Sequence, residues 1–198
     1  MTIATMKQSK SIFTPEDLLL LEGGEELYEL VDGQLLEKNM SAEAGEISIV
    51  LASEIRAFLK QHAIARITAE ATFQCFPTDP YRVRRPDLAV VLTRHFDPDN
   101  WVEGHLRIPP DIAIEILSPN DRVRDLDEKL DDYRSAGVSL VWIVKPERRS
   151  VVVYRADGSQ QPLMEHDTLT GEPVLPGFSV LVASLFPVKK ANTVKSDK

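Results

Sequence analysis

Residues 109–133 read PPDIAIEILSPNDRVRDLDEKLDDY, and this stretch decides how the chain folds. Its first part, DIAIEILS, is an apolar, isoleucine-rich run that predicts a buried strand with one carboxylate, Glu115, in its middle. A Ser-Pro-Asn turn then leads into DRVRDLDEKLDDYRSAG, which predicts a helix that ends at Gly137. A charge in a buried strand is costly unless a partner compensates it. Glu115 is therefore the first candidate site residue.

The segments around this stretch alternate between strand and helix patterns. The apolar run LVWIVK (140–145) follows the helix, so strand, helix and strand form a crossover whose two strands are parallel. Upstream, residues 42–62 carry an apolar stripe at helical spacing. Further strands are expected at residues 63–76, 85–94, 150–155 and 174–182.

The N-terminal part predicts a short helix and a hairpin. Residues 11–21 have Thr14 as a plausible N-cap and Pro15 at the first helical position. LYELVDGQLLEKN then reads as a hairpin that turns at Asp32-Gly33, and its loose alternation places it at a sheet edge. We expect a loose N-terminus over 1–12, one domain over 13–187 and a disordered tail over 188–198.

Composition and charge limit the function. The 198 residues carry a net charge of 23 − 31 = −8, which argues against general affinity of the whole surface for nucleic acid. No apolar run is long enough for a membrane span and the N-terminus lacks a signal-peptide core, so a cytoplasmic protein without membrane contact is expected. Cys75 is the single cysteine and has no partner for an internal disulfide.

Two predicted strands each carry one acid in an apolar context. Asp87 lies at the start of RPDLAVV, and Glu115 lies within the next strand. Two carboxylates on neighbouring strands repel each other unless a cation lies between them. A hard divalent ion such as Mg²⁺ suits this arrangement, because it binds one or two carboxylates together with waters and phosphates.

Lys129 is the candidate base or electrostatic group. At 100° per residue it lies about 60° from Leu126, on the rim of the apolar stripe of its helix. From there it could return to the level of Glu115 and orient or deprotonate a water, or stabilise a phosphorane charge. The alternative is a rim lysine that extends to solvent.

Other polar residues are open to two interpretations. Solvated surface positions are the simpler interpretation for the arginines, although they flank both candidate strands: Arg82, Arg84, Arg85, Arg122 and Arg124. Glu54 falls near the apolar stripe of its helix, where an acid at the edge of a helix contact is the simpler interpretation. Whether Glu29, Glu46 or Glu54 adds to the site stays open. The four histidines have no metal-ligand spacing, and no glycine-rich phosphate loop is present.

Four segments together resemble a known family. YELVDGQL, RPDLAVV, PPDIAIEILSPND and EKLDDYRSAGVSLVWIVKPERRSVVVYR closely resemble the Uma-two family of restriction endonucleases, within the PD-(D/E)XK nuclease superfamily. The likeness runs from about Phe13 to Phe186. It implies an α+β fold with an αβββαβ core, an N-terminal helix and hairpin, and additional C-terminal strands.

The resemblance also implies an activity and site roles. It implies hydrolysis of DNA phosphodiester bonds with Mg²⁺ or Mn²⁺, with Asp87 and Glu115 as metal ligands. The superfamily lysine is expected two residues after the second acid, where this chain has Leu117; the family pattern instead supplies it from the following helix, as Lys129. Gln34 and Ile47 stand where a Glu and often a His are expected. Many relatives act as homodimers, which makes a homodimer a further expectation.

Two other functions stay open from the sequence. A nuclease-like module could bind nucleic acid or a protein partner without cutting, which the acidic net charge and the missing strand lysine favour. A metal-dependent hydrolase of a smaller phosphorylated substrate would turn over a model diester without affinity for DNA.

Overall fold

A computed structural model describes residues 11–21, 27–95, 104–119 and 123–188. The predicted tail over 188–198, apart from Val188, and most of the predicted loose N-terminus lie outside these ranges, as do Asn120 and Arg122. The helices are α2 (Pro15–Leu21), α3 (Ala42–Gln61) and α4 (Val123–Ser135). The strands are β1 (Leu27–Val31), β2 (Gln34–Lys38), β3 (Ala65–Ala69), β4 (Leu88–Leu92), β5 (Ile112–Ile116), β6 (Leu140–Lys145), β7 (Ser150–Arg155), β8 (Gln160–Leu163), β9 (Thr168–Gly171) and β10 (Leu175–Leu181).

A six-stranded mixed sheet forms the centre of the molecule. Its strand order is β3-β4-β5-β6-β7-β8, and β9 and β10 form a separate pair. Strands β5 and β6 are parallel, as the crossover through α4 predicts, and the other neighbours are antiparallel. The elements α3, β3, β4, β5, α4 and β6 give the expected αβββαβ order in an α+β fold.

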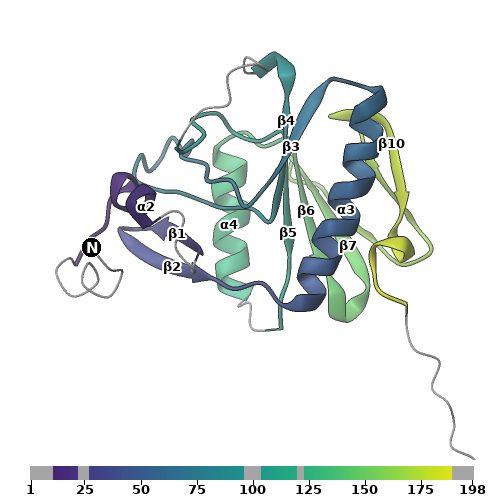
Figure 1. Cartoon of the computed structure of the whole chain (residues 1–198), viewed down its shortest axis with the longest axis horizontal. Coiled ribbons are helices and arrows are strands. Elements are labelled where there is room, and N and C mark those ends of the chain that lie inside the picture. Colours follow the sequence, from purple (N-terminus) through teal and green to yellow (C-terminus); the bar gives the residue numbers. More distant parts are fainter. Residues whose placement is uncertain (1–10, 22–26, 96–103, 120–122, 189–198) are drawn as a thin grey trace, which may run out of the picture.

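The two faces of the sheet pack against different helices (Figure 1). Side chains alternate along β5, so Ile112, Ile114 and Ile116 pack in one cluster with the apolar stripe of α3 and with β10. Ala113 packs on the other face with Leu130 and Tyr133 of α4. Every residue of β5 is buried, Glu115 included. None of the helices in the described ranges has the length and apolar character needed to cross a membrane.

The N-terminal hairpin does not extend the main sheet. Asp32 and Gly33 both have positive φ, 49° and 74°, as a two-residue hairpin turn requires. The hairpin is a two-stranded sheet of its own, and the expectation of a sheet edge is wrong. Leu30 of β1 instead forms two backbone hydrogen bonds of 2.9 Å with Val83. The segment that contains Val83 runs beside the hairpin before the chain enters the main sheet at β4.

Other strand boundaries also differ from the prediction. The strand expected over 63–76 stops at Ala69, since Glu70 takes a left-handed φ of 54° that ends the pairing. Phe73 then pairs with Arg84 through backbone hydrogen bonds of 2.8 and 3.0 Å. Strands β8 and β9 were not predicted: β8 reads QQPL, three of whose four residues are exposed, so it lacks the apolar alternation of a strand.

Candidate functional site

The register of β4 and β5 brings two acids together. Leu88 pairs with Ile114 at the end of this antiparallel ladder. Asp87 immediately precedes β4, so the same register extended by one residue sets it opposite Glu115. Directly opposed residues project from the same face of a sheet. Both carboxyl groups therefore point to one side, and both are buried, with 4% exposure each.

Asp87 is held by its neighbouring strand and by a lysine. Its Oδ2 atom accepts a hydrogen bond from the backbone N–H of Ile116 at 2.5 Å, just beyond the end of the β4–β5 ladder. Its Oδ1 atom lies 2.8 Å from Nζ of Lys38, the last residue of β2. The hairpin thus supplies a cation to the acid of the main sheet.

Glu115 accepts two hydrogen bonds from α4. The hydroxyl of Tyr133 donates to Oε1 at 2.6 Å, and Nζ of Lys129 donates to Oε2 at 3.0 Å. Burial raises the pKa of Glu115, and the negative charges of Asp87 and Glu29 add to this rise, while Lys129 and Lys38 oppose it. Tyr133, Lys129 and Lys38 thus act on Glu115 as a hydrogen-bond donor or as cations.

Lys129 joins Glu115 to a third acid, Glu29 of β1. Its Nζ atom lies 3.1 Å from Oε1 of Glu29, so one ammonium group bridges two carboxylates. Burial lowers the pKa of Lys129, but Glu115 and Glu29 raise it above its ordinary value. Burial has the opposite effect on the acid Glu29 and raises its pKa, but the charges of Lys129, Arg84 and Lys38 outweigh burial and lower this pKa to about 2. The interpretation of Lys129 as a solvent-directed rim residue is therefore wrong.

The arginines before Asp87 form the base of the site. Arg84 is 1% exposed, and its guanidinium contacts Oε2 of Glu29 at 3.1 Å and Oδ2 of Asp132 at 2.6 Å. Arg85 is 5% exposed and donates from its backbone N–H to Oε1 of Glu29 at 3.0 Å. The solvated-surface interpretation is wrong for both, because each carries backbone or carboxylate contacts that link the hairpin to the sheet.

Arg82 ties the hairpin turn to α4. Its guanidinium contacts Asp32 at 2.7 Å, Glu128 at 2.8 Å and Asp132 at 2.9 Å. Because Asp32 lies at the tip of the hairpin and the other two acids lie on α4, this side chain fixes the distance between the two elements. It thereby holds Glu29 near Lys129.

The remaining candidates lie away from this cluster. Glu46 and Glu54 are exposed on α3, and Arg124 is exposed on α4. His105 is buried, with ring nitrogens 2.8 Å from Oγ1 of Thr72 and 2.8 Å from the carbonyl oxygen of Pro15. His95 contacts Asp111 at 3.0 Å, outside the pocket that Asp87 and Glu115 line.

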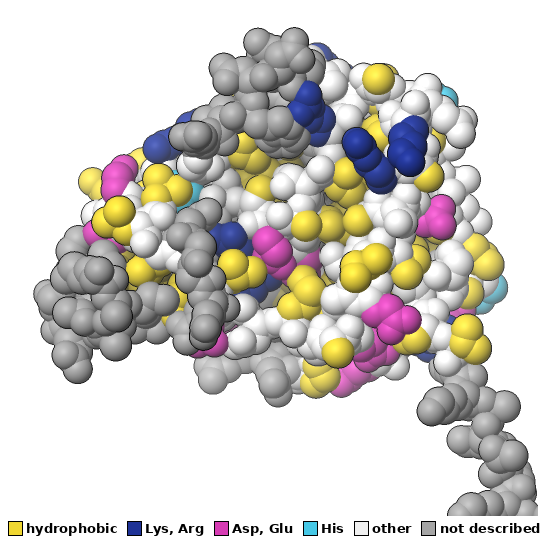
Figure 2. Space-filling view, in the orientation of Figure 1, with side chains coloured by type: hydrophobic (Ala, Val, Ile, Leu, Met, Phe, Trp, Pro, Cys, Tyr) yellow, Lys and Arg dark blue, Asp and Glu magenta, His cyan; other side chains and the backbone are white. Residues whose placement is uncertain are grey.

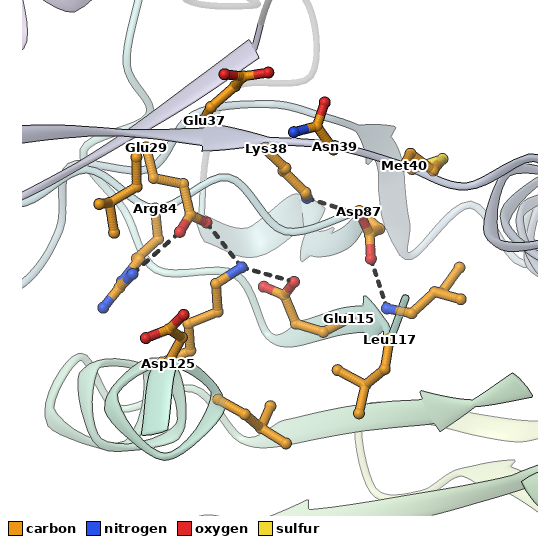
Figure 3. A pocket seen from close by; sticks show the side chains of 14 residues that line it. Glu29, Glu37, Lys38, Asn39, Met40, Arg84, Asp87, Glu115, Leu117 and Asp125 are labelled. Atoms are coloured by element: carbon orange, nitrogen blue, oxygen red, sulfur yellow. Dashed lines mark hydrogen bonds and ion pairs between the residues drawn. The ribbon is translucent and has the colours of Figure 1, made fainter. Parts of the chain in front are cut away.

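One pocket contains the three predicted site residues, Asp87, Glu115 and Lys129. It has a volume of about 130 Å³, and Figure 3 shows Lys38 pointing to Asp87 from the hairpin while Glu29 and Arg84 point to each other. Acidic and basic side chains also lie next to each other near the middle of the face in Figure 2. The ionisable side chains that line this pocket are Glu29, Glu37, Lys38, Arg84, Asp87, Glu115, Asp125 and Lys129.

Lys38 and Tyr133 were missed as site residues by sequence reasoning, and the sequence left the role of Glu29 open. Glu29 follows Tyr28 in an apolar strand, so an acid flanked by buried residues was the available signal. Tyr133 shares the apolar stripe of α4 with Leu130, and nothing in the pattern separates it from a core residue. Lys38 ends a mostly exposed strand, which gives no signal at all.

The lining of the pocket fits a divalent cation. Five acids and three bases line it, a net charge of 3 − 5 = −2, and the two acids on the main sheet offer hard carboxylate oxygens. Mg²⁺ needs only one or two carboxylates, since water and substrate phosphates complete its shell. No group of three or more His, Cys, Asp and Glu side chains in the described part of the chain is arranged as a metal cluster. The fit therefore rests on Asp87 and Glu115 alone.

A mixed sheet between two helices, with paired acids and a lysine in one pocket, defines a nuclease-like fold. A solved structure described as a putative nuclease belonging to DUF820, from Anabaena variabilis, has this fold: the TM-score is 0.76 with 21% identity, over 88% of this chain and 97% of that chain. The model of the Uma2 family, "Putative restriction endonuclease", matches residues 15–185, and the chain belongs to this family. No curated protein matches the chain.

Proposed function

We propose that the protein is a metal-dependent endonuclease that hydrolyses DNA phosphodiester bonds. The observation that carries the proposal is the convergence of Asp87, Glu115 and Lys129 in one acidic pocket, in a chain that belongs to a family described as restriction endonucleases. Asp87 and Glu115 would hold Mg²⁺ or Mn²⁺ through their carboxylates. The bound ion would polarise the phosphate and lower the pKa of an attacking water.

Lys129 acts as a donor and not as a base in this proposal. Its raised pKa keeps the ammonium protonated near neutral pH, so it has no lone pair to accept a proton. It can donate hydrogen bonds to a water or to a phosphate oxygen that gains charge in the transition state. Glu29 and Glu115 hold its Nζ atom at the edge of the pocket, which fixes the position of that positive charge.

Tyr133 and Arg84 are positioning residues in the same scheme. Tyr133 fixes one oxygen of Glu115, and Arg84 fixes Glu29, which in turn holds Lys129. Both lie beneath the groups that would face substrate and both are buried. A homodimer, expected from relatives that cut both strands, stays a prediction.

Conversion of supercoiled plasmid to open-circular and linear forms tests the proposal. We expect conversion with Mg²⁺, none with excess chelator, and a loss of activity in Asp87→Asn and Glu115→Gln. Glu54→Gln, which removes an exposed acid of α3, is the matched control and keeps full activity. Wild-type activity in both site variants would overturn the proposal.

A non-cutting module is the second candidate, and one observation favours it. All four carboxylate oxygens of Asp87 and Glu115 already have a partner within the chain: Lys38, the N–H of Ile116, Tyr133 and Lys129. A protein of this kind would retain DNA on a filter equally with and without Mg²⁺, and would leave the plasmid intact. Cleavage that depends on Glu115 excludes it.

A further inference from the structure

Lys38 occupies a position enclosed by oxygen atoms. Its Nζ atom lies 2.8 Å from Oδ1 of Asp87, 3.3 Å from Oε2 of Glu70 and 2.5 Å from the carbonyl oxygen of Arg85. The side chain is only 12% exposed. Two carboxylates and a backbone carbonyl are oxygen ligands of the kind that a hard divalent ion prefers. The ammonium group thus lies where such ligands converge.

The charge of this lysine also acts on the second acid. Burial lowers the pKa of Lys38, but Glu115 and Asp87 raise it above its ordinary value, so the group stays a cation. The charge of Glu115 thus acts on Lys38 although no hydrogen bond joins the two side chains directly. Lys38 therefore neutralises the pair of acids from the hairpin side, as Lys129 does from the α4 side.

A divalent ion between Asp87 and Glu115 would meet this positive charge directly. At a separation of a few ångströms, two cations in a poorly solvated pocket repel each other strongly. A flexible four-carbon stem allows the ammonium group to leave Asp87 without movement of the strand that carries it. Asn39 and Met40, the next residues of the chain, are exposed and line the same pocket, so Lys38 lies next to the solvent-exposed side of that pocket.

We propose that Lys38 is a built-in competitor of the divalent ion at Asp87, so that the ion binds only when the lysine withdraws. The inference rests on the metal site of the proposed function and adds its regulation by a residue of the hairpin. Lys38 thereby keeps the acids neutralised in the metal-free protein and sets how much metal is needed to fill the site. Substrate phosphate, which attracts an ammonium group, favours the withdrawn position and couples metal binding to substrate binding.

Titration calorimetry of the full chain with Mn²⁺, without DNA, tests the proposal. We expect Lys38→Met to bind Mn²⁺ about tenfold more tightly or better than wild type, because one positive charge has left the site. Lys38→Arg retains the charge and stays close to wild type or weaker. Lys60→Met, which removes an exposed cation of α3, is the control for net charge and leaves the affinity unchanged.

A second measurement assigns the ion to this site and guards against a folding defect. The double variant Lys38→Met/Asp87→Asn loses the gain in affinity if the ion binds where the lysine lay. Should Lys38→Met fail to fold, Lys38→Gln, which removes the charge but keeps a polar side chain, is titrated in its place. The melting temperature of Lys38→Gln is then expected to rise more with Mn²⁺ than that of wild type.

The outcomes separate this inference from the proposed function. Tighter Mn²⁺ binding by Lys38→Met without DNA cleavage by any variant supports the competitor role and overturns the nuclease proposal. Cleavage by wild type with equal Mn²⁺ affinity in Lys38→Met and wild type overturns the competitor role alone. Weaker binding or no binding in Lys38→Met also overturns it.

Discussion

Lys129 follows Glu115 by fourteen positions in the chain, and its Nζ atom lies 3.0 Å from Oε2 of that residue. The chain leaves the sheet after β5 and returns along α4, which brings a lysine back to the acid of the preceding strand. The same ammonium group lies 3.1 Å from Glu29 of the hairpin. One cation thus joins three elements, β5, α4 and β1, at the pocket.

Removal of Lys129 is expected to destabilise the protein as well as to reduce cleavage. Lys129→Met leaves two buried carboxylates without their shared partner, which costs about 3–5 kcal/mol. The double variant Lys129→Met/Glu29→Gln recovers part of this loss because one of the two charges is gone. Urea unfolding of the four proteins in the cycle measures the coupling, and additive free energies would contradict the bridge.

Arg84 is expected to be irreplaceable by lysine. Its planar guanidinium contacts Glu29 and Asp132 at the same time, and an ammonium group lacks that forked geometry. Arg84→Lys should lower the free energy of unfolding by about 2 kcal/mol or more. Arg134→Lys is the matched control: this arginine is exposed and pairs with Asp131 on its own helix, so the change stays within about 0.5 kcal/mol. Equal effects in the two variants would refute the bridging role.

Stability in acid should depend on Glu29. Its pKa is about 2 in the folded protein against 4.5 ordinarily, so its contribution is complete above pH 4.5 and is lost as the pH falls towards 2. At about 1.4 kcal/mol per pKa unit, the shift corresponds to roughly 3 kcal/mol. The difference in unfolding free energy between wild type and Glu29→Gln should therefore be large at pH 7 and shrink towards zero near pH 2. A difference that is constant with pH would show that the carboxylate has no such shift.

Tyr133→Phe should separate positioning of Glu115 from packing of the core. The ring stays in the α4 cluster, but the donor to Oε1 is lost, which costs about 1.5–3 kcal/mol for a hydrogen bond to a charged group. We expect slower cleavage with little change in DNA affinity. Tyr81→Phe, at an exposed tyrosine, is the control and leaves both unchanged. Wild-type cleavage by Tyr133→Phe would remove this residue from the site.

The spacing of apolar residues predicts most of the core correctly, because the buried face of a strand or helix requires apolar side chains at a fixed interval along the sequence. Isoleucines at every second position of β5 and the apolar stripe of α3 predicted the core on one face of the sheet. The Asp32-Gly33 pair likewise predicts the hairpin turn from local sequence alone, and both residues have the positive φ of such a turn. The αβββαβ order came from the family resemblance, and the structure has it.

The partners of the acids were not predictable, since long-range contacts decide them. Arg84 pairs with Glu29 across fifty-five positions and Lys38 reaches the backbone of Arg85 across forty-seven. An arginine near a strand has the same local pattern whether it is solvated or buried against a carboxylate. Only the placement of the hairpin over the pocket distinguishes the two, and no local pattern encodes that placement.

Metal-dependent cleavage through Glu115 is tested most directly by the single-turnover rate of cleavage of an end-labelled DNA duplex by wild type and Glu115→Gln, measured as a function of Mg²⁺. We expect a wild-type rate that rises with Mg²⁺ and saturates, and a rate lower by a factor of about 10³ or more in Glu115→Gln, with binding of the duplex retained. Equal rates in the two proteins, or a wild-type rate independent of Mg²⁺, would contradict the proposed mechanism.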